Sequence, residues 1–133
     1  MEQRLKKLEQ ILLNDRFAGT NGIRLVSIGK GEAVAEMNVL DNHLNGVDII
    51  QGGAIFTLAD FAFAAASNSH GRIAVAANAS INFFKGVSSG KLIARAKELS
   101  SGKTLATYWV DVVDEQENRI ALFNGTAFMK GEY

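Results

Sequence analysis

The feature that most constrains the fold is an apolar run inside the stretch LNGVDIIQGGAIFTLADFAFAAASNS, residues 44–69. From Ala54 to Ala66 this run is rich in alanine, leucine and phenylalanine without strict alternation, so it predicts a helix rather than a strand. A helix of this length reaches only about 20–25 Å, too short to cross a membrane comfortably. Apart from Thr57 and Asp60 its faces are apolar, so it should be buried on every side. The rest of the chain must wrap around it.

Six segments with strand-like patterns flank this helix. Two precede it, at residues 23–28 and 32–40, and four follow it, at residues 73–84, 91–99, 104–113 and 119–130. The turns between the last four are short and contain Gly, Ser or Asp, which predicts an antiparallel meander. We therefore predict an α+β fold in one domain, residues 1–133, with a curved antiparallel sheet of about six strands around the central apolar helix.

An amphipathic helix is predicted at the N-terminus, residues 1–13, and should lie on the surface of the core. Its apolar residues recur at helical spacing and are Leu5, Leu8, Ile11 and Leu12. Phe17 should anchor the segment that follows. The outer face of the sheet would remain uncovered, and the candidates to lie there are Trp109, Ile93 and either Phe123 or Leu122. Such a face predicts a homodimer with a continuous sheet.

Composition excludes several classes of function. The formal net charge of zero leaves no electrostatic footprint for nucleic acid or for an anionic membrane, so neither partner is expected. The absence of cysteine excludes disulfides, thiolate metal sites and a cysteine nucleophile. The charged, amphipathic N-terminus lacks the features of a signal peptide, so a cytoplasmic location is expected.

Asp60 is the most informative candidate for chemistry. Its helical neighbours at three and four residues are Thr57, Phe56, Phe63 and Ala64, so its surroundings are mostly apolar. A carboxylate in such a place is costly unless it is hydrogen-bonded, paired or open to a ligand. Two interpretations follow: a functional carboxylate, or one that caps a loop or pairs with an arginine such as Arg72 or Arg95.

The start of the helix, Gln51-Gly52-Gly53, is the second candidate. Free N–H groups in the first turn of a helix can hold an anion or an oxyanion, although a glycine pair also suits an ordinary flexible helix start. Asn45, in an Asn-Gly turn, could position a water or a carbonyl, or only make the turn. Gly53 and Asp60 would lie about 10–12 Å apart along one helix. A two-fold dimer that presents Asp60 of one chain to Gly53 of the other would bring them together.

Other polar residues carry weaker signals. His43 and His70 fall in predicted loops, without a partner at the spacing of a catalytic triad or a metal site, and are interpreted as solvated. Asp41, His43 and Asp48 share one loop, but their spacing fits no familiar metal site. No metal is therefore expected.

The block Asn45-Gly46, Gln51-Gly52-Gly53 and FTLADFAFAAASNS (residues 56–69) resembles the hot-dog fold thioesterases, and most closely the phenylacetate-pathway (PaaI-like) acyl-CoA thioesterase branch. INFFKGVSSG (residues 81–90) and ALFNGTAF (residues 121–128) resemble later strands of that family. The resemblance implies a helix wrapped by an antiparallel sheet, and hydrolysis of an acyl-CoA thioester to a carboxylic acid and CoA. CoA would be part of the substrate, and no separate cofactor is implied.

The resemblance also implies roles for individual residues. Asp60 would activate water or attack the thioester, the Gly53 N–H would polarise the thioester carbonyl, and Asn45 would help to place the water or the carbonyl. CoA would lie along a dimer groove, and the residues expected near it are Gly52, Ser80, Phe83, Lys85 and Ser88. The family often builds tetramers from such dimers.

Gln51 departs from the family pattern, because many members carry histidine at this position. A glutamine amide can donate to a carbonyl but cannot titrate, which leaves a polarising role and excludes an acid role. Two other functions of the fold remain as alternatives. A non-catalytic acyl-CoA-binding domain would have no need of Asp60, and a dehydratase or hydratase would want a histidine near an acid. The acyl group is not readable from the sequence.

Overall fold

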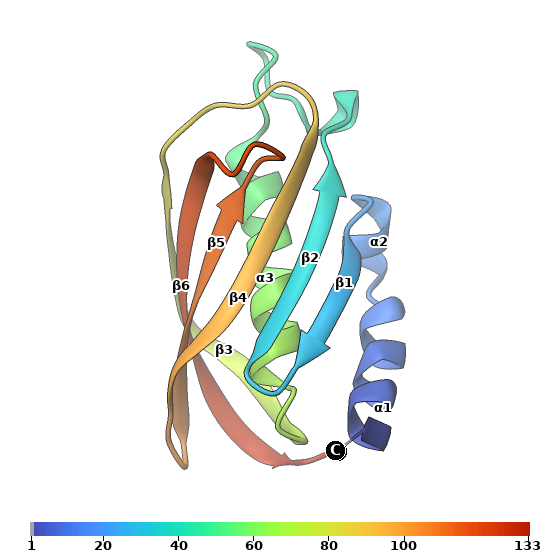
Figure 1. Ribbon diagram of the computed structural model, residues 1–133, viewed down its shortest axis with the longest axis vertical. Helices are drawn as coiled ribbons and strands as arrows, with labels where there is room; N and C mark the ends of the chain where they lie inside the picture. Colours follow the sequence, from blue (N-terminus) through green and yellow to red (C-terminus); the bar gives the residue numbers. More distant parts are fainter. Residues whose placement is uncertain (1) are drawn as a thin grey trace.

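The computed structural model describes residues 2–133 (Figure 1). Two helices, α1 (Glu2–Leu13) and α2 (Arg16–Thr20), precede the strands β1 (Arg24–Gly29) and β2 (Glu32–Asn38). A short 3-10 helix, η1 (Asp41–His43), leads to the central helix α3 (Gly52–Ser67). The remaining strands are β3 (Arg72–Phe83), β4 (Lys91–Ser101), β5 (Leu105–Val113) and β6 (Arg119–Glu132).

The six strands form one antiparallel sheet in the order β1-β2-β4-β5-β6-β3, and the sheet curves around α3 (Figure 1). The predicted sheet around a helix is confirmed, but the predicted meander is wrong at one connection. β3 lies at the far edge beside β6, and β4 pairs with β2 instead. The connecting loop, residues 84–90, can extend to about 23 Å, which lets the chain cross the end of the sheet instead of turning back at once.

The core lies between α3 and the inner face of the sheet. Alternate residues of the inner strands point at the helix, as the period of two predicts, and many of them are alanines that let the helix approach closely. Phe63 of α3 meets two aromatic rings of the sheet, with ring centroids 5.7 Å from Tyr108 and 5.5 Å from Phe123. Phe123 is fully buried in this core, so its suggested place on the outer face is wrong. Trp109 does lie outside, 41% exposed.

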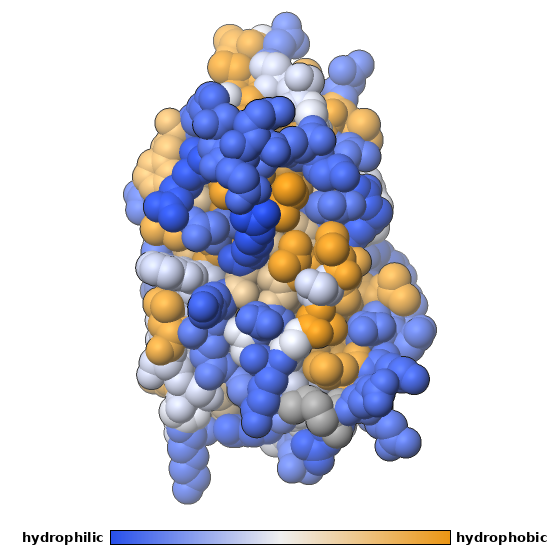
Figure 2. Space-filling model, viewed as in Figure 1, coloured by the Kyte–Doolittle hydropathy of each residue, from blue (hydrophilic) through white to orange (hydrophobic). Residues whose placement is uncertain are grey.

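The N-terminal segment covers the edge of the sheet at β1. α1 turns Leu8 and Leu12 inward but leaves Ile11 exposed, and Met1 lies outside the described residues. α2 was not predicted, and its Phe17 is 67% exposed, so it does not anchor the segment as expected. Figure 2 shows apolar side chains gathered over β1 and its junction with α1, where Leu13 and Val26 are exposed. Within residues 2–133, no helix combines the length and the apolar character needed to cross a membrane.

Candidate active site

The central helix is open along one stripe. Gly53 is exposed, and Thr57, Asp60 and Ala64 are half-buried, while the remaining positions between Thr57 and Ala64 face the core. Gly52, Ala54 and Phe56, near the start of the helix, are also half-buried. Gly53, Thr57, Asp60 and Ala64 follow one another at intervals of three or four, so they lie on one face of α3. We call them the open stripe. The expectation that the helix is covered on every side is therefore wrong along this stripe.

Asp60 is the acidic residue of the open stripe. Among the described residues it has no hydrogen-bond or ion-pair partner. Burial raises the pKa of Asp60 above its ordinary value, and the negative charge of Asp15 raises it further. An unpaired carboxylate with a raised pKa on an accessible face can accept a proton or attack an electrophile.

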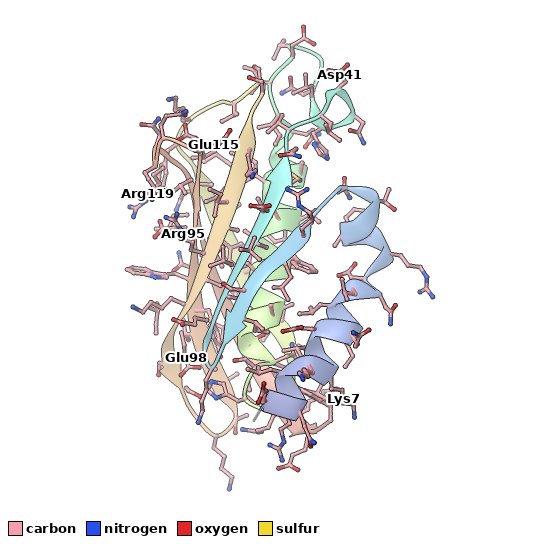
Figure 3. The ribbon with its side chains drawn as sticks, turned by 45° about the vertical axis from the view of Figure 1, so that its right-hand side comes forward. Lys7, Asp41, Arg95, Glu98, Glu115 and Arg119 are labelled. Carbon is pink, nitrogen blue, oxygen red and sulfur yellow. The ribbon has the colours of Figure 1, made fainter. Side chains whose placement is uncertain are left out.

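The proposed pairing of Asp60 with an arginine is wrong for both candidates. Arg95 forms a two-bond ion pair with Glu117, at 2.6 and 2.9 Å, on the outer face of the sheet away from α3 (Figure 3). Arg72 donates to the carbonyls of Lys130 and Lys103. The interpretation of Asp60 as a structural counter-ion therefore has no support in the described contacts.

The side chain of Gln51, the residue just before α3, caps the start of this helix. The Gln51 Oε1 accepts a hydrogen bond from the Gly53 N–H at 2.9 Å, which leaves the Gln51 amide NH₂ available as a donor. Gly52 allows a close approach of Phe83, since a Cβ there would lie 3.1 Å from the Phe83 Cζ atom. Gly53 and Asp60 both lie in α3, two helical turns or about 10 Å apart along the axis.

Cavities open on both sides of this helix start. One, of about 330 Å³, is lined by Gly52, Phe83 and Lys85 with Ile49, Ile50, Ile55, Phe84 and Gly86. The other, of about 250 Å³, is lined by Gln51, Gly53 and Thr57 with Phe17, Asn21, Asn42, His43, Leu44 and Ala54. The helix start thus separates two hollows, one facing β3 and one facing α2.

Asn45 and Ser88, both expected near the site, have other contacts, and Ser80 lies apart from the two cavities. The Asn45 side-chain oxygen accepts from the Val47 and Ile49 N–H groups, so it shapes the loop before α3 and leaves only its amide nitrogen free. The Ser88 hydroxyl donates to the Asp48 carbonyl at 2.7 Å. Ser80 is exposed in the middle of β3 and lines neither cavity.

The two histidines are not solvated, contrary to the sequence interpretation. His43 is buried; its Nδ1 accepts the Leu40 N–H and its Nε2 lies 3.0 Å from the Asn21 carbonyl, so it ties η1 to the end of α2. His70 contacts the Glu98 carboxylate, which also accepts the Tyr108 hydroxyl at 2.9 Å. Both histidines therefore join segments that are distant in sequence.

The sequence interpretation missed Asp15 and the cavity residues around Phe17. Asp15 lies just before α2 and lines a cavity together with Phe61, the residue that follows Asp60 in α3. Its sequence signal is weak: Asp15 reads only as a helix cap, and five residues of α2 are too few to show a period.

Comparison with known proteins agrees with this geometry. A family model described as the thioesterase superfamily matches residues 48–121, which include all of α3. The acyl-coenzyme A thioesterase PaaI of Escherichia coli is 39% identical over 119 residues, which are 89% of this chain and 85% of that protein.

Solved structures match along most of the chain. The Escherichia coli PaaI structure superposes with a TM-score of 0.92 at 34% identity and covers 98% of this chain and 96% of its own. A Streptococcus mutans protein solved bound to acetyl CoA gives a TM-score of 0.79 at 30% identity, over 83% of this chain and 90% of its own. The hot-dog fold expected from the resemblance is confirmed.

Proposed function

Because the chain belongs to the thioesterase superfamily, we propose that it is an acyl-CoA thioesterase that hydrolyses its substrate to a carboxylic acid and free CoA. The observation that carries the proposal is Asp60: an unpaired, half-buried carboxylate on the open stripe of α3, two turns from a glycine helix start. A protein that only bound the CoA ester would gain nothing from placing a desolvated carboxylate there. The name of the Escherichia coli relative supplies the class of substrate.

Asp60 is assigned the role of general base or nucleophile. As a base it takes a proton from water while the water oxygen attacks the thioester carbonyl carbon. As a nucleophile its own oxygen attacks, and water then cleaves the resulting anhydride. In both routes the C–S bond breaks, and the CoA sulfur leaves as a thiolate that takes up a proton. The raised pKa of Asp60 makes it a stronger base than an exposed aspartate.

We assign to the start of α3 the binding of the thioester carbonyl oxygen. The Gly53 N–H and the Gln51 amide are donors that can stabilise the negative charge that develops on this oxygen. Since Gln51 Oε1 accepts the Gly53 N–H in the free chain, the Gln51 side chain must rotate before the substrate can use that donor. The free amide nitrogen of Asn45 is a third candidate donor for the carbonyl or the water.

A second copy of the chain is needed to complete the site. Gly53 and Asp60 of one chain are too far apart to act on one carbon atom. β3 is an edge strand whose outer edge is unpaired in this chain and which exposes Ile73 and Val75. Pairing of β3 with β3 of a second copy would continue the sheet and bring Asp60 toward Gly53 of the partner subunit. Two such dimers would make the expected dimer of dimers.

The CoA part of the substrate is assigned to the side of the helix start that faces β3. Gly52, Phe83 and Lys85 already share the cavity there, and Lys85 carries a charge suited to phosphate. Ser80 and Ser88 lie further along the same strand and loop and would reach CoA only at the edge of the dimer groove.

The test is release of free thiol from a panel of aryl, short-chain and long-chain acyl-CoAs, with wild type beside Asp60→Asn. We expect wild type to release thiol and Asp60→Asn to lose at least a hundredfold in rate, as for a missing general base, while still binding CoA esters in calorimetry. A fully active Asp60→Asn would overturn the role of Asp60. Binding without release by wild type would favour the non-catalytic acyl-CoA-binding domain.

A further inference from the structure

Thr57 lies between the two groups of α3 that take part in the proposed reaction. It follows Gly53 by four residues and precedes Asp60 by three, so all three share the open stripe. Thr57 also lines the hollow of about 250 Å³ that faces α2, together with Gln51 and Gly53. One water takes up about 30 Å³ of liquid volume, so this hollow has ample room for the water that attacks the thioester.

The hydroxyl hydrogen of Thr57 already has a partner. Oγ1 donates it to the Gly53 carbonyl at 2.8 Å, a bond from the side chain back to the preceding turn of the helix. Since a hydroxyl has one donor and two acceptor lone pairs, Oγ1 has only lone pairs left to offer. The same bond fixes the side-chain rotamer, because Oγ1 has to point along the helix toward its start. Thr57 therefore presents an oriented hydrogen-bond acceptor on the open stripe.

The Asp60 carboxylate is a second acceptor one helical turn away. It has no hydrogen-bond or ion-pair partner among the described residues, and the Thr57 hydroxyl does not donate to it. Residues three apart on a helix have Cβ atoms about 5–6 Å apart. One water can bridge two oxygens up to about 5.5 Å apart, since each O–H···O bond spans about 2.7–2.8 Å. Thr57 and Asp60 of one chain therefore suit a water that donates one hydrogen bond to each.

The neighbours of Asp60 along α3 offer no alternative to Thr57. The positions three and four residues away hold Phe56, Thr57, Phe63 and Ala64, and of these four only Thr57 has a polar side chain. The other two members of the open stripe, Gly53 and Ala64, have no side-chain oxygen. A water held by the Asp60 carboxylate therefore finds its second acceptor on α3 at Thr57.

We propose that Thr57 positions the attacking water for Asp60. The water donates one hydrogen to the Asp60 carboxylate and the other to Thr57 Oγ1, so that a lone pair of its oxygen faces the thioester carbonyl carbon. Fixing both O–H bonds removes the free rotation of the water, and this orientation lowers the barrier to attack. The inference rests on the proposed function, in the route where Asp60 is the base and the carbonyl is bound at Gly53 of the partner subunit.

The two hydrogens of the water have different fates. As the C–O bond forms, the hydrogen that faces Asp60 passes to the carboxylate as a proton. The hydrogen that faces Thr57 stays on the oxygen and becomes the hydroxyl hydrogen of the product acid. The C–S bond then breaks, its electron pair leaves with the sulfur, and the thiolate takes up the proton that Asp60 received. Thr57 itself gains and loses nothing in the reaction.

Methanol as a competing nucleophile tests this role directly. Methanol has one O–H bond, so it needs the Asp60 base but makes no use of a second acceptor. Its attack gives a methyl ester and free CoA. The experiment measures free thiol, acid and methyl ester from one acyl-CoA that wild type hydrolyses, at a fixed methanol concentration, for wild type and for variants of Thr57.

We expect Thr57→Val, which keeps the shape of the side chain without the hydroxyl, to lower kcat for hydrolysis about three- to tenfold with little change in KM. This is the effect of losing one hydrogen bond that matters in the transition state. The ratio of methyl ester to acid should rise by the same factor, because methanolysis does not need the hydroxyl. Thr57→Ala, which also lacks the hydroxyl and suits a helix well, should raise the ratio too.

Two variants serve as controls. Thr57→Ser keeps the hydroxyl and should retain the wild-type rate and ratio. Thr20→Val removes the same kind of bond elsewhere, from Thr20 Oγ1 to the Arg16 carbonyl at 2.9 Å, and should leave both values unchanged.

A purely structural role for Thr57 gives a different result, because damage to the fold lowers hydrolysis and methanolysis equally. If both Thr57→Val and Thr57→Ala form ester and acid in the wild-type ratio, or form no ester, the inference is overturned while the proposed function stands. If wild type releases no thiol from any acyl-CoA, the proposed function fails and the inference fails with it.

Discussion

Asp60 links the chemistry of the site to its stability. Its pKa in the folded protein lies above its ordinary value of 3.8, so the folded state binds this proton more tightly than the unfolded chain does. The contribution of Asp60 to stability therefore falls as the pH rises from 3.8 through the folded pKa. At neutral pH Asp60 therefore lowers the stability of the fold, as functional residues often do.

We therefore expect Asp60→Asn to have a higher free energy of unfolding than wild type at pH 7. The gain should disappear below pH 3.8, where Asp60 is protonated in both states. Urea denaturation of both proteins at one protein concentration and at the two pH values measures this difference. A variant less stable than wild type at pH 7 would mean that Asp60 has a stabilising partner in solution.

Single residues were predictable where the signal was local. Asp60 stood out because it is the one carboxylate in an apolar run, and the glycine pair because it opens the same helix. Asp15, His43 and His70 were missed or wrongly interpreted, because their partners lie in segments distant in sequence: α3, the Asn21 carbonyl and Glu98. Contacts between segments so far apart in sequence cannot be predicted from the local sequence pattern.

At the scale of elements, α3 and β6 pack closely at Gly125. A Cβ at this position would lie 2.9 Å from ring atoms of both Phe63 and Phe123, and these rings are buried and cannot swing out. Position 125 therefore requires glycine, because the Phe63 ring of α3 packs directly against it. Local propensity would not predict this, since glycine is a poor strand residue.

Gly125→Ala should lower the free energy of unfolding by about 1–3 kcal/mol, the usual cost of overpacking a core. Gly131→Ala on the same strand is the matched control, because a Cβ there meets nothing within 4 Å, and it should stay within about 0.5 kcal/mol of wild type. Chemical denaturation of the three proteins gives the comparison. Equal stability of Gly125→Ala and wild type would show that Phe63 can move aside.

The elements themselves were predictable to within a few residues, because their hydrophobic periods are long and regular. The position of β3 was not, because strand pairing depends on where a loop can reach and not on the pattern of the strand. The residue 84–90 loop reads as a turn but crosses the end of the sheet to β4. α2 and η1 are too short to show any period.

At the scale of the whole molecule, the two edges of the sheet differ. β1 is shielded by α1, whereas β3, twelve residues long, exposes the apolar side chains of Ile73 and Val75 and has an unpaired edge. Long apolar edges of this kind are normally covered in a working protein. A second copy paired at β3 would cover this edge and would also complete the proposed site.

Val75→Lys should therefore dissociate the proposed dimer into monomers, because it places a charged side chain on the strand proposed to pair. Thiol release should be lost together with the dimer, since neither protomer holds a complete site. Sedimentation velocity and the thiol assay, run on the same samples, measure both. The control is Val26→Lys, which changes an exposed apolar residue of the shielded strand β1 and should remain dimeric and active. Dissociation of this variant and not of Val75→Lys would place the interface at β1 instead of β3.

The cap that Gln51 places on Gly53 has a consequence for how a thioester is recognised. In the free chain the Gly53 N–H donates to the Gln51 amide oxygen. If this N–H instead donates to the thioester carbonyl oxygen when the substrate binds, one neutral acceptor replaces another. Such an exchange changes the free energy little. Once the oxygen becomes an anion it is by far the better acceptor, so the same exchange turns strongly favourable. Because the Gly53 N–H already has an acceptor in the free chain, it adds little to the binding of the substrate but stabilises the tetrahedral intermediate.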